Sequence, residues 1–402
     1  MSSVGTELDD VSAVFGALLS EISAATPTAT PTATSDVMSA IAGIFSANPT
    51  NITQNAIQLI QNGLVPARLE GVIDGFSDES NSDDNVNSSP AGGPLYPQAS
   101  DEDPSYEISE SRLRGAINIP PVILVPGTGL KGGISFQSNL IKLLSNSTYG
   151  DPVWLNIPGF LLADAQESAE FVAYAIHYVS AVSGGSNVSV IAWSQGNLDA
   201  QWAFKYWPSA RKLVANFISI SADFHGTILA NVLCPSFPKL PCPPSVIQQR
   251  YTSGFIRTLR IDDGDSAYVP TTSIFSATDE IVEPQHGQSA SAFIKDARNV
   301  GVSNNEVQSI CAGQPAGSLY THEGVLFSPL AYALIVDALT NPGPGDPSRL
   351  DLGTLCQQVV TPELSLEDAL VTQATLVIAV LNLYTYKDKV FIEPPIKEYA
   401  AS

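Results

Sequence analysis

The stretch V-S-V-I-A-W-S-Q-G at Val188–Gly196 decides the fold of this 402-residue chain. Its first four residues form a short run rich in β-branched side chains, which predicts a buried strand. The next segment, Asn197–Pro208, mixes apolar residues with Gln and Lys and predicts a helix. Ser194 stands in the turn between them, and the small residues Ala192 and Gly196 let strand and helix approach closely. The stretch therefore predicts a strand, a sharp turn with a serine at its apex, and a helix.

A serine in such a turn is well placed for nucleophilic chemistry. The turn lifts its hydroxyl above the sheet, and the start of the helix presents backbone N–H groups and a positive dipole end to a developing oxyanion. However, Ala192 stands where the usual pattern G-x-S-x-G has its first glycine. Taken alone, the pentapeptide favours a surface serine in a strand–helix turn, and only its surroundings change that assessment.

Three further motifs flank this turn. V-I-L-V-P-G-T-G precedes it at Val122–Gly129, whereas D-F-H-G-T-I-L-A and S-A-T-D-E-I-V-E-P-Q follow at Asp223–Ala230 and Ser276–Gln285. Together with the serine turn, the series resembles the Candida antarctica lipase B family of fungal lipases over roughly Pro104 to Glu393. The resemblance implies an α/β-hydrolase fold, with a central, mostly parallel sheet flanked by helices.

A serine nucleophile needs a base to take its proton and a carboxylate to orient that base. In α/β-hydrolases the order along the chain is serine, acid, histidine, and His286 and His322 both follow Ser194 and Asp279. The resemblance places the catalytic histidine at His322, whereas His286 fits an exposed loop residue. Glu323 follows His322 where the family usually has a small residue, so this carboxylate either raises the pKa of the imidazole or faces water.

Three acidic residues compete for the third place in the triad. The resemblance favours Asp279, with Glu280 as its neighbour. Asp223 follows the strand expected at Phe217–Ser221, and the carboxyl ends of such strands face the site. Asp223 is therefore a candidate either for lining the site or for a structural hydrogen bond.

The oxyanion hole is assigned by the same resemblance. It implies that Thr128 donates its backbone N–H and its hydroxyl and that Gln195 donates its backbone N–H. Glycines beside Thr128 let the backbone approach a ligand closely. The further candidates for contacts with substrate are Gly127, Gly129, Trp193, Asp223 and Ile281.

Composition narrows the classes of partner. The chain has 18 Lys and Arg against 40 Asp and Glu, a net charge of −22, which argues against binding nucleic acid or anionic membrane surfaces. No run reaches the ~18 consecutive apolar residues that a membrane span needs. No His/Cys cluster with metal-ligand spacing appears, so neither a metal nor another cofactor is expected. We expect a monomer that binds ester or lipid substrates. We also expect it to make transient contact with lipid interfaces.

Cysteines and sequons indicate a secreted, extracellular glycoprotein. The four cysteines allow three pairings. The short spacing of Cys234 and Cys242 fits a local disulfide, and the resemblance implies a second disulfide between Cys311 and Cys356. Few cysteines, little lysine and several sequons fit an oxidising secretory route. The sequons begin at Asn51, Asn87, Asn146 and Asn187.

The chain is expected to divide into an N-terminal helical extension and linker, residues 1–103, and a catalytic domain, residues 104–402. Apolar residues at helical spacing predict helices at Val11–Ala24, Ser35–Ala47 and Ile52–Leu64, and the Ser/Asp/Gly-rich Gly75–Asp103 predicts a mobile linker. Helices of this length are unstable alone, so they must pack on the core. We favour packing away from the substrate mouth over a cap across it.

The function predicted from these residues is a secreted serine ester hydrolase. A lipase that cleaves carboxylic esters such as triacylglycerols, with transesterification when water is scarce, fits the motifs best. One alternative is a carboxylesterase or polyester hydrolase that acts on soluble or polymeric esters. The other is a non-catalytic binding protein on the same fold, because fold alone does not imply activity.

Overall fold

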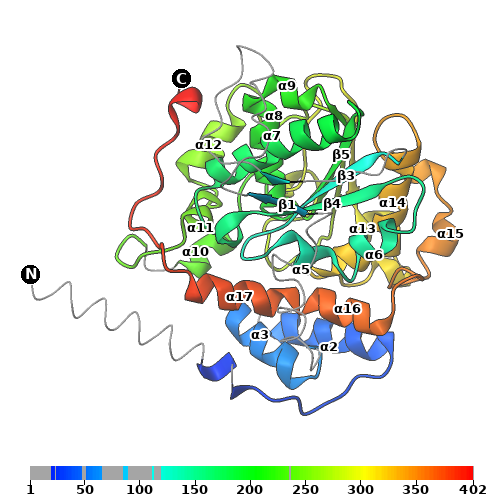
Figure 1. Cartoon of the computed structure of the whole chain (residues 1–402). Helices are drawn as coiled ribbons and strands as arrows, with labels where there is room; N and C mark the ends of the chain where they lie inside the picture. The colour runs from blue at the N-terminus through cyan, green and yellow to red at the C-terminus, as the bar shows by residue number, and fades with distance from the viewer. Residues whose placement is uncertain are drawn as a thin grey trace, which may run out of the picture.

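The computed structural model describes residues 20–22, 24–47, 51–65, 85–88, 111–112, 119–234 and 237–401. Within these residues an eight-stranded sheet, in the order β2-β1-β4-β3-β5-β6-β7-β8, is flanked by helices (Figure 1). The strands from β4 to β8 in this order are all parallel, β1 adds to β4 in parallel, and β2 is antiparallel to β1. The strands are β1 (Asn85–Ser88), β2 (Ser111–Arg112), β3 (Pro121–Val125), β4 (Asp151–Asn156), β5 (Val188–Trp193), β6 (Val214–Ile220), β7 (Thr271–Phe275) and β8 (Val302–Glu306).

Helices connect and cover the parallel strands, and this agrees with the α/β-hydrolase fold expected from the sequence. The α-helices are α2 (Thr34–Ala47), α3 (Ile52–Gln61), α5 (Gly132–Phe136), α6 (Leu140–Leu144), α7 (Ala165–Val182), α8 (Gly196–Tyr206), α9 (Pro208–Arg211), α10 (Leu229–Leu233), α11 (Pro244–Gln248), α12 (Gly254–Arg260), α13 (Val307–Ile310), α14 (Pro329–Thr340), α15 (Leu352–Leu355), α16 (Leu366–Gln373) and α17 (Thr375–Thr385). The 3-10 helices are η1 (Pro158–Leu161), η2 (Gly287–Ser289), η3 (Pro315–Gly317), η4 (Gly324–Phe327), η5 (Pro347–Arg349) and η6 (Glu398–Ala400).

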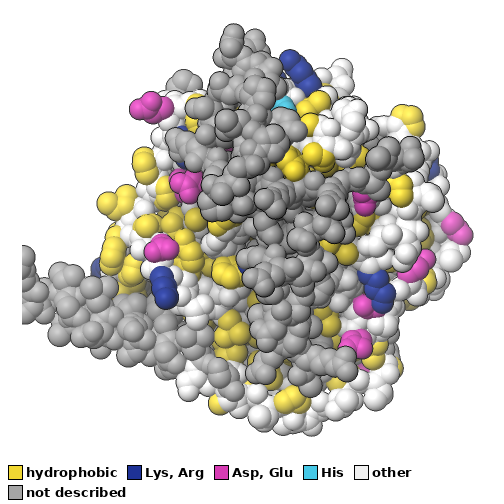
Figure 2. Space-filling model, in the orientation of Figure 1, with side chains coloured by type: hydrophobic (Ala, Val, Ile, Leu, Met, Phe, Trp, Pro, Cys, Tyr) yellow, Lys and Arg dark blue, Asp and Glu magenta, His cyan; other side chains and the backbone are white. Residues whose placement is uncertain are grey.

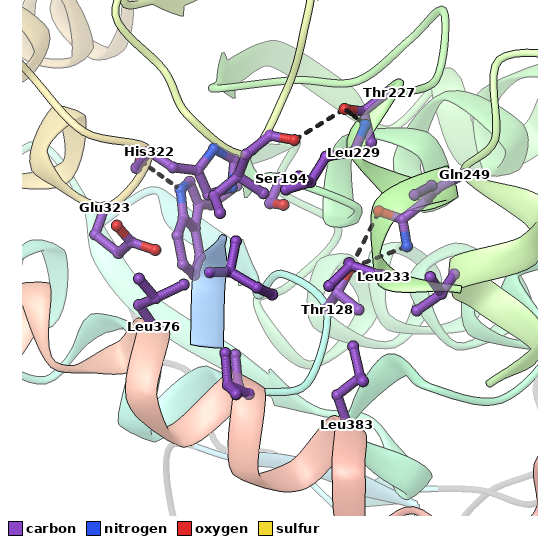
Figure 3. Close-up of a pocket in the computed structure, with 17 residues that line it drawn as sticks. Thr128, Ser194, Thr227, Leu229, Leu233, Gln249, His322, Glu323, Leu376 and Leu383 are labelled. Atoms are coloured by element: carbon purple, nitrogen blue, oxygen red, sulfur yellow. Dashed lines mark hydrogen bonds between the residues drawn. The ribbon is translucent and has the colours of Figure 1, made fainter. Parts of the chain in front are cut away.

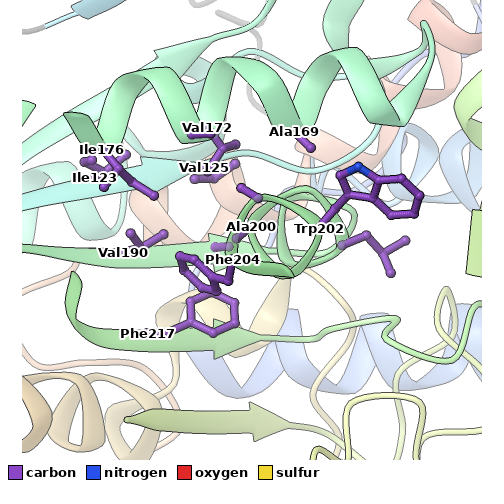
Figure 4. Close-up of a cluster of buried hydrophobic side chains, with 14 of the residues drawn as sticks. Ile123, Val125, Ala169, Val172, Ile176, Val190, Ala200, Trp202, Phe204 and Phe217 are labelled. Carbon is purple, nitrogen blue, oxygen red and sulfur yellow. The ribbon is translucent and has the colours of Figure 1, made fainter. Parts of the chain in front are cut away.

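The strand before the serine, β5, lies inside the sheet between β3 and β6. Every residue of β5 is buried, because helices cover both faces of a parallel sheet. On one face α7 and α8 pack against alternate residues of β3, β5 and β6, and Figure 4 shows Phe204 of α8 beside Phe217 of β6. On the other face α5, α6 and α14 pack against the remaining strand residues. This packing fixes the carboxyl end of β5, and with it the serine turn.

The apolar segment near the C-terminus forms two consecutive helices in the structure. α16 and α17 meet at Ala374, and α16 begins with a capping box between Ser365 and Asp368. The combined stretch Leu366–Thr385 is long and apolar enough to cross a membrane, and 67% of its most apolar window is buried in the structure. Its apolar residues are buried inside the protein, because α17 packs against the core on one side and against α3 on the other.

The N-terminal helices α2 and α3 lie along α16 and α17, on the side away from the sheet (Figure 1). They agree with the helices predicted at Ser35–Ala47 and Ile52–Leu64, although α3 ends three residues earlier, at Gln61. Most of the helix predicted at Val11–Ala24 lies outside the described residues. Of the predicted linker Gly75–Asp103 the structure describes only β1, which pairs with β4.

The four cysteines form the two disulfides that the sequence analysis expected, Cys234–Cys242 and Cys311–Cys356. They close loops of very different length, with sequence separations of 8 and 45 residues. In the chain-entropy description of the unfolded state, a longer loop gives a larger stabilisation.

We expect the variant Cys311→Ser/Cys356→Ser to lose about 4 kcal/mol of unfolding free energy, and Cys234→Ser/Cys242→Ser about 2.5 kcal/mol. Denaturant unfolding of both variants and of the parent protein measures the two losses. Non-reducing peptide mapping of the parent verifies the pairs. A peptide linked through Cys242 and Cys311, or an equal loss in both variants, would contradict this assignment.

Candidate active site

Ser194 lies at the carboxyl end of β5 in the conformation expected of a strained turn. Its φ is +56°, a left-handed value that non-glycine residues rarely adopt. The turn is tight, because a Cβ on Gly196 would lie 2.5 Å from the carbonyl oxygen of Pro126. Asn197 Nδ2 donates to the carbonyl oxygens of Ser194 and Ile220, each at 2.9 Å, and so supports the turn from within. The side chain of Ser194 consequently opens into a pocket.

His322 lies beside Ser194 in the same pocket (Figure 3). His322 Nδ1 is 2.8 Å from Asp279 Oδ2, while Asp279 Oδ1 accepts from the backbone N–H groups of Ile281 and Val282. The carbonyl of His322 accepts from the indole of Trp193 at 3.1 Å. His322 Nε2 is buried and has no hydrogen-bond partner among the described residues. The imidazole is therefore oriented at one nitrogen and free at the other.

The charges around His322 favour its protonated form. Burial by itself lowers the pKa of the imidazole, but the negative charges of Asp279, Glu323 and Asp223, with the hydrogen bond to Asp279, raise it above its usual value. An imidazole with a raised pKa is a stronger base, and once protonated it is stabilised by its acidic surroundings.

Glu323, the acidic neighbour singled out in the sequence, does not face bulk water. It is only 2% exposed, lines the pocket, and accepts a hydrogen bond from Gln373 Nε2 at 3.1 Å. Glu280 is also buried, and its Oε2 accepts from the backbone N–H of His322 at 3.1 Å. Burial raises the pKa of Glu323 to about 7, and burial together with Glu323 raises the pKa of Glu280. Two carboxyl groups with raised pKa values therefore border the histidine.

Thr128 and Gln195, the candidates for an oxyanion hole, are joined by a third side chain. Thr128 Oγ1 donates to Gln195 Oε1 at 2.7 Å. Gln249 Nε2 donates to both, at 3.0 Å to Thr128 Oγ1 and 2.9 Å to Gln195 Oε1. The network fixes the loop after β3 against the start of α8, so the backbone groups of both are held beside Ser194.

The pocket around these groups encloses about 650 Å³, open mouth included, and its walls are mostly apolar. Figure 3 shows Leu376 and Leu383 of α17 facing Leu229 and Leu233 of α10 across it. The lining residues are Ile52, Thr128, Trp193, Ser194, Thr227, Leu229, Ala230, Leu233, Val246, Gln249, Ile281, His322, Glu323, Leu376, Ala379, Val380 and Leu383. Among the residues that the structure describes, no three His, Cys, Asp or Glu side chains are grouped so that they could hold a metal ion.

The other predicted substrate contacts divide into two groups. Trp193 and Ile281 line the pocket. Gly127 and Gly129 support it: a Cβ on Gly127 would lie 2.8 Å from Ser194 Cβ, and one on Gly129 would lie 2.9 Å from the carbonyl of Ala379. Asp223 is fully buried and outside the lining, and burial raises its pKa to about 7. When ionised it adds negative charge that raises the pKa of His322, and it offers no surface that a substrate in the pocket can touch.

Several described residues of the pocket are absent from the sequence predictions, and two of them, Gln249 and Ile52, come from segments that no motif or resemblance connects with the site. Gln249 comes from the loop after α11, where no motif marks it. Ile52 comes from α3, in the N-terminal extension, so the expectation that this extension packs away from the substrate mouth is wrong at this residue. The pattern of Ile52–Leu64 indicates an amphipathic helix but does not say which surface receives it.

Comparison with known proteins gives a consistent result. The chain matches no family model. It is 35% identical to lipase B of Pseudozyma antarctica over 285 residues, which cover 70% of this chain and 79% of that protein. Its fold superposes on the crystal structure of Aspergillus fumigatus lipase B with a TM-score of 0.86 and 44% identity, covering 97% of this chain and 96% of the other. The chain therefore belongs to the lipase B family of α/β-hydrolases.

Proposed function

We propose that this member of the lipase B family, a carboxylic ester hydrolase, works through Ser194 as nucleophile, His322 as general base and Asp279 as the carboxylate that orients the base. One observation carries the proposal: Asp279 binds Nδ1 of His322, while Nε2 is left free beside Ser194 in an apolar pocket. Hydrogen bonds between a serine and its base are often long before substrate binds, so the free Nε2 fits this role.

In the proposed reaction Ser194 Oγ attacks the ester carbonyl as its proton passes to His322 Nε2. The carbonyl oxygen becomes an oxyanion, which the backbone N–H groups of Thr128 and Gln195 stabilise. The carbon–oxygen bond to the alcohol then breaks, and His322 returns the proton to the departing alcohol. Water, or a second alcohol, attacks the acyl-enzyme with the same base, so that hydrolysis or transesterification completes the cycle.

The substrates we propose are esters with apolar chains, triacylglycerols among them. The pocket walls are leucine, isoleucine and valine side chains from α3, α10 and α17. Next to the pocket, Ile228 and Val232 are 55% and 45% exposed, and Figure 2 shows apolar side chains gathered around α10 and the end of α17. Such a patch favours transient contact with a lipid interface. A soluble-ester or polyester hydrolase would instead show no preference for long acyl chains.

The decisive experiment is pre-steady-state release of p-nitrophenol from p-nitrophenyl butyrate. An acyl-enzyme mechanism predicts a burst equal to the number of active sites, followed by slower turnover. Phosphonylation at Ser194, located by peptide mass analysis, identifies the nucleophile. A fully folded protein that shows no turnover of any ester would favour the binding-protein alternative. Secretion is a further proposal, supported by the two disulfides, and extracellular recovery of the protein from its source tests it.

The carboxyl groups beside His322 predict the pH dependence. The base must be neutral to accept the proton from Ser194, and the negative charge of Glu323 favours its protonated form. Replacing Glu323 by Gln removes this charge but keeps an oxygen for Gln373, so the pKa of His322 falls. We therefore expect the acid limb of the kcat/KM profile to move to lower pH in Glu323→Gln. The matched control is Glu367→Gln, at an exposed site on α16, which should leave the profile unchanged; a shift to higher pH in Glu323→Gln would contradict the argument.

A further inference from the structure

The N-terminal extension contributes a side chain to the pocket itself. Ile52 is the first residue of α3, is 7% exposed, and lines the pocket together with Leu376 and Val380 of α17. The remaining pocket residues all come from Thr128 onward, in the predicted catalytic domain. Among the residues that the structure describes, Ile52 is therefore where the extension reaches the substrate pocket.

The structure fixes the position of Ile52 on both sides. Before it, Asn51 caps α3 by accepting a hydrogen bond from the backbone N–H of Gln54 at 3.0 Å. After it, the hydroxyl of Thr53 is hydrogen-bonded to the hydroxyl of Tyr384 on α17. The first turn of α3 is thus hydrogen-bonded to α17, the helix whose residues Leu376 and Val380 line the pocket beside Ile52.

The buried face of α3 strengthens this attachment. Ala56, Ile57 and Leu59 belong to one apolar cluster with Val377 and with three residues that line the pocket, Leu229, Leu376 and Val380. Helix packing of this kind is rigid, because protein interiors are close-packed and yield little to a ligand. A substrate chain that meets Ile52 therefore meets a fixed wall rather than a mobile loop.

We infer that Ile52 is a specificity-determining residue, which limits the size of the apolar chain that the ester can place between α3, α10 and α17. The inference rests on the proposed function and extends it to the N-terminal extension. Ile52 takes no part in the chemistry, because its side chain is a hydrocarbon that can neither transfer a proton nor stabilise an oxyanion. Its effect should therefore appear as a ratio between substrates, not as a loss of all activity.

The test compares kcat/KM for p-nitrophenyl butyrate and p-nitrophenyl palmitate in two variants, one with a smaller and one with a larger side chain at position 52. Ile52→Ala removes volume from the wall and should raise the palmitate-to-butyrate ratio about tenfold, since a methylene group in an apolar pocket changes discrimination by roughly that factor or more. Ile52→Phe adds volume and should lower the ratio. Ethyl butyrate and hexadecyl butyrate form a second arm, which tells whether the chain against Ile52 belongs to the acyl or to the alcohol part.

The matched control is Ile57→Ala. Ile57 is in the same helix and the same cluster, is equally buried at 7% exposed, and does not line the pocket. It should lose thermal stability as Ile52→Ala does, but keep the parent ratio in both arms. Equal ratios in the two alanine variants, or an unchanged ratio in both Ile52 variants, would overturn the inference. Active-site titration separates this outcome from failure of the proposed function, because the parent must first give a p-nitrophenol burst.

Discussion

Ser194→Ala should reduce kcat for p-nitrophenyl butyrate by about 10⁶, the order of loss seen when a serine hydrolase loses its nucleophile. The substitution removes one oxygen and keeps the Cβ, so the contacts of the turn persist, including the Asn197 hydrogen bonds to backbone carbonyls. The left-handed φ of residue 194 also persists, and alanine adopts it no less readily than serine.

Three measurements test this expectation together. The turnover rate gives the loss, circular dichroism and the melting temperature show that the variant is folded, and phosphonate labelling shows whether another nucleophile takes part. A folded Ser194→Ala protein with a substantial fraction of the parent activity would exclude Ser194 as the nucleophile.

Replacement of His322 by Ala should lower kcat/KM by about 10² to 10⁴, because a positioned general base contributes that much. His286→Ala is the matched control, because His286 also follows Asp279 in the sequence but has a side chain that is 78% exposed and paired with Glu306 at 3.1 Å. It should retain nearly full activity.

The comparison of His322→Ala with His286→Ala has one outcome that would contradict the assignment of His322 as the base. Loss of activity in His286→Ala, with near-parent activity in His322→Ala, would move the base to the loop after Asp279. Peptide-level phosphonate labelling of Ser194 in the His322 variant adds a second readout. Labelling should become much slower, because the serine is no longer deprotonated by the imidazole.

The part of the site that follows a strand was predictable from local sequence. The β-branched run before Ser194 predicts the strand that ends at this residue. The apolar run before Thr128 predicts a second strand, and the glycines around Thr128 predict the tight loop that follows it. His322 is different, because it lies 43 residues after Asp279 and follows no strand; the short 3-10 helix η4 begins only two residues later. Its assignment required the resemblance to a family, and the structure then brings it to Asp279.

Long-range packing decides the features that sequence reasoning missed. Thr53 and Tyr384 are hydrogen-bonded although they lie 331 residues apart in the sequence, and the periodicity of neither segment predicts that contact. In the same way, Gln249 joins Thr128 and Gln195 from a segment without a motif. Amphipathic spacing indicates that a helix has a buried face, but the surface that buries it is selected by the rest of the fold.

The left-handed conformation of Ser194 has a consequence for protein engineering. A non-glycine residue in this region is less stable than glycine by on the order of 1 kcal/mol. The turn is fixed by its neighbours, so Ser194→Gly would relieve this strain and gain some thermal resistance while eliminating the proposed nucleophile. Directed evolution of this protein under heat selection alone would thus enrich inactive sequences, and each round needs an esterase screen alongside it.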